Sequence, residues 1–385
     1  MARVQDLMQI GFNPMQAKHL ADHIISVQTT DAIGDGTADD TAAIQRAVTI
    51  FSQTAKGAIY FPPGKVYRIS NVVLPERVVL FSDGVGDGGP IIKANSSSAM
   101  FTLPTSGENF VQFYGLNFNG NSTAAAIIDN KASSYTQVKD CSFYNATVGI
   151  DMTDGGYYCR YSHNRFYGTT TGISIDGPGN AMLIDNNEFE GAQTYCILTG
   201  ASNTSDSITI VDNYFGASSG TDGIKLQNTA GFQGKSASIL RNRFDMSPSN
   251  SHINIGRYVQ AIVHQNSCAA AITNLIKCDG TNCDIRDNYL ASSTGAAIAV
   301  TTNAVSTRLG FQQFGTGGVA CSSDFSDAGT GTTIERIIVK NTTANRPTPL
   351  ACEVGRVNLD TTLDADGLPI LWQGTKWIKY DGTNA

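Results

Sequence analysis

The feature that most constrains the fold of this chain is a repeat of 22 to 29 residues between about residues 110 and 315. Its clearest copies read HNRF, NNEF, DNYF and RNRF, and each ends in a large apolar residue. The apolar residues align in one column, formed by Phe118, Phe143, Phe166, Phe189, Phe215, Phe244, Cys268, Leu290 and Phe314. Short strands that repeat at this period, separated by polar turns, are typical of a solenoid.

A second apolar column supports a solenoid built of β-strands. It holds Ile150, Ile173, Cys196, Ile224, Ile253, Leu275 and Ile298. Leucine-rich repeats have a similar period, but they need several leucines per repeat, whereas these repeats use Ile and Phe. We therefore predict a β-helix with one coil per repeat.

An asparagine stands two places before many members of the first apolar column. These residues are Asn164, Asn187, Asn213, Asn242, Asn266 and Asn288. Asparagine tolerates the left-handed backbone of a tight turn, and its amide can bond to the equivalent amide one coil away. We therefore expect an asparagine ladder along the solenoid.

Composition narrows the classes of partner and cofactor. Only 15% of the residues are charged, and the 39 glycines fit a turn-rich β protein. The net charge of −7 argues against a nucleic-acid partner and an anionic membrane surface. No apolar run is long enough for membrane insertion. The eight cysteines form no CxxC pair, so we expect Cys141 and Cys268 to be free thiols in the core, and we predict no metal and no cofactor.

The N-terminal part contains a candidate cap for the open end of the solenoid. In DAIGDGTADDTAAIQRAV (31–48), apolar residues recur at helical spacing after Asp39 and Asp40, either of which could cap the helix. The following stretch, GAIYFPPGKVYRIS (57–70), predicts a strand, a turn and a second strand. A calcium loop is the alternative use of these aspartates, but a structural cap is favoured because an uncovered end would expose apolar surface and a free sheet edge.

These two stretches resemble the N-terminal cap of the pectate-lyase-3-like right-handed β-helices, a superfamily that includes many bacteriophage tailspikes. The resemblance implies an all-β, right-handed parallel β-helix with an α-helical N-terminal cap. It also implies a homotrimer that binds bacterial surface polysaccharide and commonly cleaves it.

The ends of the sequence fit this resemblance. We predict a virion-docking helical segment at 1–26, the cap and first coils at 27–109, the β-helix body at 110–344 and a small C-terminal β module at 345–385. Trp372 and Trp377 in this module would seal a trimer interface or contact a glycan.

The first residues also bear on location. They include no apolar signal-peptide core, so we expect synthesis in the host cytoplasm and incorporation into the phage tail, with the N-terminus on a baseplate or adaptor. The first helix could instead pack on the cap. A secreted pectin-degrading enzyme is less favoured, because it would need an export signal.

Strand alternation places a group of charged and aromatic side chains on one outward face. If Phe189 points inward, Glu188 and Glu190 both point outward, about 6.6 Å apart along the strand. Aligned coils then form one outward column from Arg165, Glu188, Tyr214 and Arg243, and another from Tyr144, Tyr167, Glu190, Gly216 and Asp245.

This patch could hydrolyse a glycosidic bond, which requires one protonated and one ionised carboxyl group. The candidate catalytic residues are Glu188, Glu190, Asp212 and Asp245. The candidate substrate-binding residues are Arg165, Tyr167, Tyr214 and Arg243. Glu190 and Asp245 would stand two coils apart, about 9.6 Å between backbones, which suits an inverting enzyme. Glu188 with Glu190 is the closer pair.

Other interpretations of the surface remain open. The arginines could simply pair with solvated carboxylates. A second candidate patch contains Asp151, Asp154 and Asp176. A polysaccharide lyase could use Arg165, Tyr167 and Arg243, and a non-catalytic receptor-binding tail fibre would need no carboxylate pair.

Overall fold

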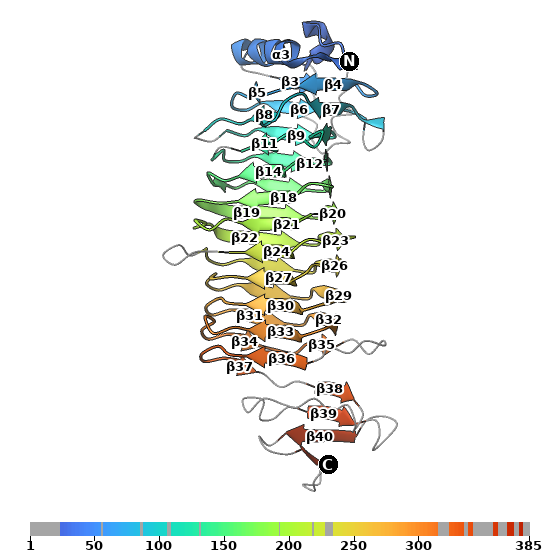
Figure 1. Ribbon diagram of the computed structural model, residues 1–385. Helices are drawn as coiled ribbons and strands as arrows, with labels where there is room; N and C mark the ends of the chain where they lie inside the picture. Colours follow the sequence, from blue (N-terminus) through green and yellow to red (C-terminus); the bar gives the residue numbers. More distant parts are fainter. Residues whose placement is uncertain are drawn as a thin grey trace.

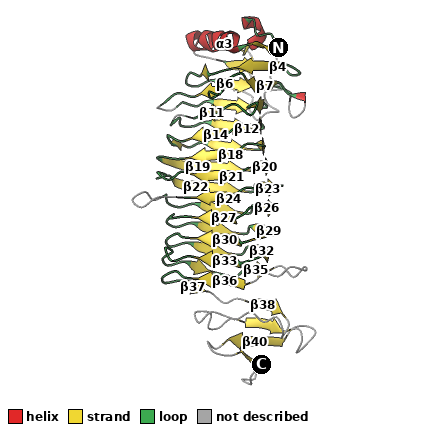
Figure 2. Cartoon of the chain, in the orientation of Figure 1, coloured by secondary structure: helices red, strands yellow, loops and turns green. Residues whose placement is uncertain are grey.

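The computed structural model describes residues 24–341, apart from 55–56, 85–87, 106–108, 131, 192, 218, 228–233, 315–322 and 335–337, together with three strands beyond residue 341. The described chain winds into a rod of stacked coils, with the helix α3 at the N-terminal end (Figure 1). Three parallel sheets run along the rod, and strands make up most of each coil (Figure 2).

Sheet 1 contains, in spatial order, β1 (Ile24–Ser26), β3 (Ala58–Tyr60), β6 (Val79–Phe81), β9 (Gln112–Tyr114), β12 (Gln137–Lys139), β16 (Arg160–Ser162), β19 (Gly179–Asp185), β22 (Asp206–Val211), β25 (Ser238–Leu240), β28 (Ile262–His264), β31 (Asp284–Arg286), β34 (Arg308–Leu309) and β37 (Thr333–Ile334), and β15 (Gly156–Tyr157) also pairs with β19. Sheet 2 contains β2 (Asp35–Asp39), β4 (Val66–Ile69), β7 (Ile91–Ala94), β10 (Asn117–Asn119), β13 (Ser142–Tyr144), β17 (Arg165–Tyr167), β20 (Glu188–Glu190), β23 (Tyr214–Gly216), β26 (Arg243–Asp245), β29 (Ser267–Ile272), β32 (Tyr289–Ser293) and β35 (Gln313–Phe314).

Sheet 3 contains β5 (Val72–Val73), β8 (Phe101–Thr102), β11 (Ala126–Asp129), β14 (Val148–Met152), β18 (Thr171–Ile175), β21 (Tyr195–Thr199), β24 (Asp222–Leu226), β27 (Ser251–Ile255), β30 (Asn274–Cys278), β33 (Ala296–Val300) and β36 (Ser323–Asp327). The chain visits sheets 1, 2 and 3 in turn, so each coil adds one strand to each sheet. The predicted right-handed parallel β-helix is confirmed.

The first apolar column forms as predicted, and its members from Phe118 to Leu290 are buried inside the rod. Strand register pairs its members from Phe118 through to Phe314. Between Phe143 and Phe244, consecutive ring centroids lie 4.5–5.0 Å apart and the rings are within 9° of parallel. Stacking at the coil spacing therefore adds aromatic contacts to the burial of apolar surface.

The second column was wrong at two positions. Register aligns Ile173 with Ile197 and then Ile224, and aligns Ile253 with Ile276, so Cys196 and Leu275 are each one residue off.

The error arises because strict alternation fails at this point of sheet 3. Cys196 and Leu275 are fully buried beside Ile197 and Ile276, so two successive residues face the core. At the equivalent position Gly172 leaves room for a phenyl ring, because a Cβ there would lie within 2.8 Å of Phe189. A period-two pattern cannot distinguish between two adjacent inward residues.

The asparagine ladder is confirmed. In each step from Asn164 to Asn288, the side-chain oxygen of one asparagine accepts hydrogen bonds from the backbone N–H and the side-chain amide of its neighbour, at 2.8–3.0 Å. Gln312 continues the ladder by accepting two bonds from Asn288 at 3.1 Å. These amides are buried, so the ladder satisfies polar groups that water cannot reach.

The expected backbone conformation of the ladder was misplaced by one residue. The left-handed residues are those just before the asparagines, such as His163, Asn186 and Asp212, with φ of 54–57°. The asparagines themselves are held by the amide ladder. The left-handed backbone of the turn and the amide hydrogen bonds of the ladder therefore belong to neighbouring residues.

The N-terminal cap forms as the sequence predicted. Helix α3 (Thr41–Thr54) follows a 3-10 turn (Val27–Thr30), and its residues Ile44, Val48 and Phe51 are buried in the core. Asp39 Oδ1 accepts a hydrogen bond at 3.0 Å from the N–H of Thr41, the first helical residue. Asp40 instead accepts bonds from the backbone N–H groups of the preceding loop, at 2.6 Å from that of Ile33.

The predicted boundaries can be compared with the strands that the structure describes. Ile24–Ser26 already pairs with β3, so the first coil begins inside the predicted 1–26 segment, whose residues 1–23 lie outside the described residues. The small C-terminal sheet contains β38 (Ile338–Asn341), β39 (Val357–Asp360), β40 (Leu368–Trp372) and β41 (Trp377–Lys379). It begins inside the predicted body, and Trp372 pairs with Trp377 in register.

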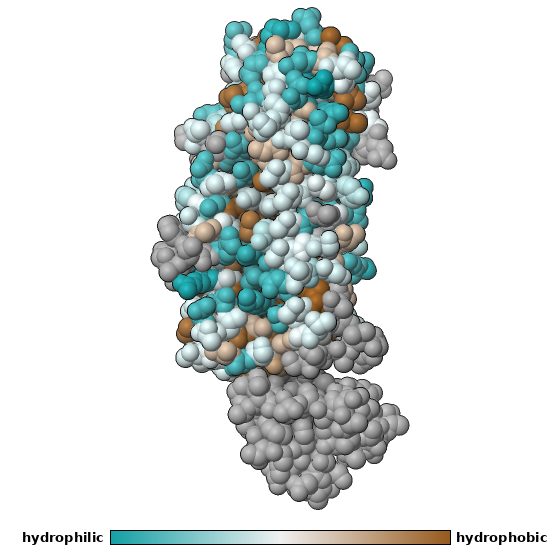
Figure 3. All heavy atoms as spheres, in the orientation of Figure 1, coloured by the Kyte–Doolittle hydropathy of each residue, from teal (hydrophilic) through white to brown (hydrophobic). Residues whose placement is uncertain are grey.

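Burial follows the same division between the inside and the outside of the coils. Cys141 and Cys268 are buried free thiols, as expected. The face of the rod seen in Figure 3 is largely hydrophilic, with apolar side chains scattered across it. None of the helices in the described part of the chain has the length and apolar character needed to cross a membrane.

Candidate functional site

Four neighbouring strands of sheet 2 carry the predicted patch. Their register aligns Arg165 with Glu188, Glu188 with Tyr214, and Tyr214 with Arg243, which is the first outward column. In the second column Tyr167 aligns with Glu190, and Gly216 aligns with Asp245 on the following strands. Sequence alternation thus located both columns correctly.

Arg165 holds two carboxylates together. Its guanidinium Nη2 lies 2.8 Å from Glu190 Oε2, and its Nε lies 3.5 Å from Glu188 Oε2. The Glu190 side chain is 22% exposed and that of Glu188 is 42% exposed, so Glu190 is the more shielded member of the pair. A bound polymer could reach both carboxyl groups from solvent.

The environment distinguishes the two glutamates. Partial burial raises the pKa of Glu188, and the neighbouring Glu190 raises it further, against an opposing effect of Arg165. The close hydrogen bond to Glu190 in turn raises the pKa of Arg165. Glu188, whose raised pKa favours the protonated form, therefore lies beside Glu190, which is bonded to a cation. Acid–base catalysis by two carboxyl groups requires such a difference between them.

Tyr214 forms the centre of the next part of the patch. A Cβ on Gly216 would lie 2.6–2.8 Å from the Tyr214 ring, so the ring lies over this glycine and takes the place of a side chain in the second column. The Arg243 guanidinium carbon lies 5.7 Å from the ring centroid, and its Nη2 lies 2.6 Å from Asp245 Oδ2. Partial burial raises the pKa of Tyr214, and the charge of Asp245 adds to this effect.

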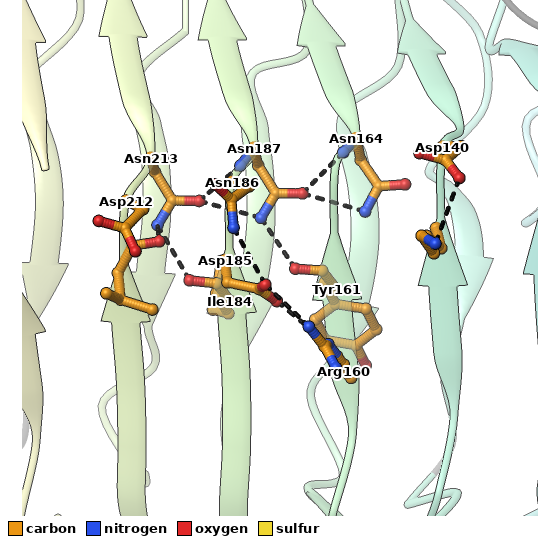
Figure 4. A network of polar contacts seen from close by, with 12 residues as sticks. Asp140, Arg160, Tyr161, Asn164, Ile184, Asp185, Asn186, Asn187, Asp212 and Asn213 are labelled. Carbon is orange, nitrogen blue, oxygen red and sulfur yellow. Dashed lines mark hydrogen bonds and ion pairs between the residues drawn. The ribbon is translucent and has the colours of Figure 1, made fainter. Parts of the chain in front are cut away.

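Asp212 and Tyr167 lie at the margins of the patch. Asp212 occupies the left-handed corner beside the asparagine ladder, where Figure 4 shows it next to Asn213. Both of its oxygens accept hydrogen bonds from Arg241, each at 2.8 Å. Tyr167 is 47% exposed, and its ring centroid lies 6.4 Å from that of Tyr144.

The structure therefore brings the predicted residues together in two groups. Arg165, Glu188 and Glu190 form one, and Tyr214, Arg243 and Asp245 form the other. Asp212 belongs to a separate pair at the corner.

Sequence reasoning missed two features that shape the patch. One is the role of Arg241 as the partner of Asp212. The other is the place over Gly216 that the Tyr214 ring occupies, for which a glycine at an outward strand position was the available signal. A further ion pair joins Arg160 to Asp185 at 3.0 Å on sheet 1 (Figure 4).

Two of the three carboxylates of the second candidate patch, Asp151 and Asp176, bond to their own turns. Asp151 accepts a hydrogen bond from the Thr153 N–H at 3.1 Å, and Asp176 accepts one from the Gly177 N–H at 2.9 Å. These contacts give both aspartates a structural role in the corner loops. Among the described residues, no group of three or more His, Cys, Asp or Glu side chains is placed to hold a metal ion.

Comparison with known sequences supports the predicted resemblance at the N-terminal end. Residues 24–110 match the sequence model of the family described as "Rhamnogalacturonase A/epimerase, pectate lyase-like". No curated protein sequence matches the chain.

Solved structures with the same fold come from enzymes and phages. The DFA-IIIase of Arthrobacter chlorophenolicus A6 is similar with a TM-score of 0.62 at 13% identity, over 86% of this chain and 97% of that one. ORF18 of Geobacillus virus E2 gives 0.58 at 15% identity over 84% of this chain, which spans only 62% of that protein. Tailspike protein 3 of bacteriophage CBA120 gives 0.50 at 13% identity, over 96% and 71%. The predicted pectate-lyase-like β-helix, related in fold to phage tailspikes, is thereby confirmed.

Proposed function

We propose that this chain is a phage tailspike that binds a bacterial surface polysaccharide, a capsule or an O-antigen, and hydrolyses its glycosidic bonds. The observation that carries the proposal is the pair of carboxyl groups, Glu188 and Glu190, held by Arg165 on an outward face of the β-helix. The family match at residues 24–110 supports a carbohydrate substrate, and the likeness to two phage proteins supports the tailspike role.

The electrostatics of the pair suggest a division of roles. Glu188, whose pKa is raised, would donate its proton to the glycosidic oxygen as the bond to the anomeric carbon breaks. Glu190, bonded to Arg165, would act as the base or nucleophile. Asp245 is the alternative partner for Glu190, on the next coil but one, and Asp212 stays a weaker candidate because Arg241 engages both of its oxygens.

Tyr214, Tyr167, Arg165 and Arg243 would bind the sugar chain. Tyrosine presents an apolar ring and a hydroxyl group to solvent, which suits a ligand with both apolar faces and hydroxyl groups. A lyase would use Arg165, Tyr167 or Arg243 as its base, whereas the pair of carboxyl groups at Glu188 and Glu190 is the arrangement that glycoside hydrolysis uses. We therefore favour hydrolysis over elimination.

The test is to incubate the full chain with capsular and O-antigen polysaccharides from a panel of bacteria. Chain length, new reducing ends and the ultraviolet absorbance of new double bonds would be followed together. We expect shorter chains and new reducing ends without the absorbance. Glu188→Gln and Glu190→Gln should each lower turnover by about 100-fold or more while binding of the polymer is retained.

The matched control is Asp284→Asn, which removes a carboxylate paired with Arg286 on sheet 1, away from the patch. Turnover by this variant should equal that of the wild type. Cleavage with new double bonds would establish a lyase instead. Binding of a polysaccharide without any cleavage would establish a non-catalytic receptor-binding fibre.

A further inference from the structure

A column of aromatic side chains lies outside the core, at the corner where each coil passes from sheet 3 to sheet 1. Phe110, Tyr135 and Tyr158 occupy this corner in three consecutive coils, just before strands β9, β12 and β16. The rings of Phe110 and Tyr135 stack with centroids 4.5 Å apart and planes at 15°. The rings of Tyr135 and Tyr158 stack at 5.0 Å and 13°.

The backbone at these positions makes the aromatic residues unusual. Phe110, Tyr135 and Tyr158 have left-handed conformations, with φ of 49°, 57° and 56°. Bulky residues rarely adopt this region, because the Cβ approaches the backbone. The same corner of the later coils holds small or polar residues with φ of 54–61°, namely Ala181, Ser207, Ser236, Gln260, Asn282 and Ser306. The fold therefore does not need aromatic side chains at this corner.

The two ends of the column differ. At the first end, the guanidinium carbon of Arg77 lies over Phe110, 5.9 Å from the ring centroid, beside a hollow of about 440 Å³ lined by Arg77, Val79, Phe110 and Gln112. At the other end Tyr158 is 54% exposed, and its one ring neighbour among the described residues is Tyr135. The next position in the column is Ala181, where a ring would continue the stack but only a methyl group is present.

We infer that the exposed ring of Tyr158, above Ala181, is a stacking site for one pyranose ring of a glycan chain, separate from the carboxylate patch. The next two positions of the column, Ala181 and Ser207, are small, and one step along the column is about 4.8 Å, so the place beyond Tyr158 is open enough for a sugar ring. A pyranose has an apolar face of axial C–H groups and a rim of hydroxyl groups. The Tyr158 ring can cover that face, and the half-buried Asn180 beside Ala181 offers polar atoms at the rim.

The site and the carboxylate patch can serve the same polymer. Tyr158 and Arg165 belong to one coil, seven positions apart in sequence, which is at most about 25 Å of extended chain. Strand β16 separates them, so one glycan chain could cross sheet 1 and contact both. The stacking site does not depend on whether the carboxylates cleave anything, because stacking on Tyr158 requires no bond to break.

The test uses simple pyranosides, which have no polymer linkage to cleave. Saturation-transfer NMR on the full chain would compare methyl β-D-glucopyranoside and methyl β-D-galactopyranoside with sorbitol, a polyol that has no ring face. We expect transfer to the axial ring protons of at least one pyranoside and none to sorbitol. Tyr158→Ala should weaken the transfer about tenfold, and Tyr158→Phe should keep it within about twofold, because the ring face provides the binding.

A second variant covers the platform instead of removing it. Ala181→Arg places a guanidinium over the Tyr158 ring, as Arg77 lies over Phe110 at the other end of the stack, and it should abolish the transfer while the protein stays folded. Gln260→Arg adds the same side chain at the same corner three coils further on and should leave the transfer unchanged. Absence of transfer with the wild type, or transfer that survives both Tyr158→Ala and Ala181→Arg, would overturn the inference.

Discussion

A side chain in this molecule has as its main neighbours the equivalent side chains of the coils on either side. Glu188 lies between Arg165 and Tyr214, and Asn213 lies between two other asparagines. Repetition therefore determines the environment of a residue as strongly as its own identity does. A substitution therefore changes the contacts with the equivalent residues of both neighbouring coils. A residue that departs from the repeat, such as Gly216, marks a place where a neighbouring side chain occupies the space.

His252 is such a departure inside the rod. Its ring, on β27 of sheet 3, stacks on Phe244 with the ring centroids 5.2 Å apart, and its Nε2 lies 2.9 Å from the carbonyl oxygen of Met246. Its Nδ1 has no hydrogen-bond partner among the described residues. Burial disfavours the charged form and lowers the pKa of His252 from 6.5 to about 4.

This gives a prediction for stability against pH. The folded-state pKa lies below the unfolded one, so the stabilisation is complete above pH 6.5 and is lost as the pH falls from 6.5 to about 4. The loss from this residue should reach about 3 kcal/mol, and His252→Phe, which cannot titrate, should not suffer it. Urea unfolding at several pH values between 7 and 4 measures the difference, and equal declines in the two proteins would contradict the prediction.

Each coil of this fold covers the coil before it along the rod. Helix α3 covers the N-terminal end, where no earlier coil is present. Its buried face meets the first coils, while Ala42 on the same helix is exposed. An uncovered coil would place apolar side chains and free strand edges in water. The helix is therefore needed for the stability of the whole N-terminal end.

Substitution within α3 should reveal this role. Ile44→Asp places a charge at a fully buried position, so the helix should detach and the nearby strands β1 and β3 should lose protection. Hydrogen exchange followed by mass spectrometry should show faster exchange there, with little change at β28 and β31. Ala42→Asp on the exposed face is the control, and unchanged exchange in Ile44→Asp would show that the cap is dispensable.

The elements also show how far sequence reasoning extends. Phe189 and its equivalents could be placed because one large residue recurs at each coil and alternation fixes its two neighbours. The register of sheet 3 could not be placed at Cys196, because two adjacent residues face inward there and the pattern allows either. The pairing of Asp212 with Arg241 was equally hidden, because the sequence gives the column of each residue but not the direction of its side chain.

At the scale of the whole molecule, the proposed tailspike role requires association. The likeness to a phage tailspike concerns the fold, and the predicted trimer is therefore a separate proposal. We expect light scattering to give a mass of about 122 kDa, three times the 40.8 kDa of one chain. The trimer should persist on dilution to nanomolar concentration, and a mass of one chain at micromolar concentration would contradict it.

The regular stacking of coils has a consequence for how such a molecule can change length. Each coil rises by about 4.8 Å and keeps the same three-sheet outline, so adding or removing one complete repeat shifts everything beyond it along the axis without turning the outward columns out of line. The length of the rod therefore changes in fixed steps of one coil. Duplication of a 22- to 29-residue segment would place the C-terminal end one coil further from the N-terminal end, while Glu188, Glu190 and Arg165 stay aligned with one another.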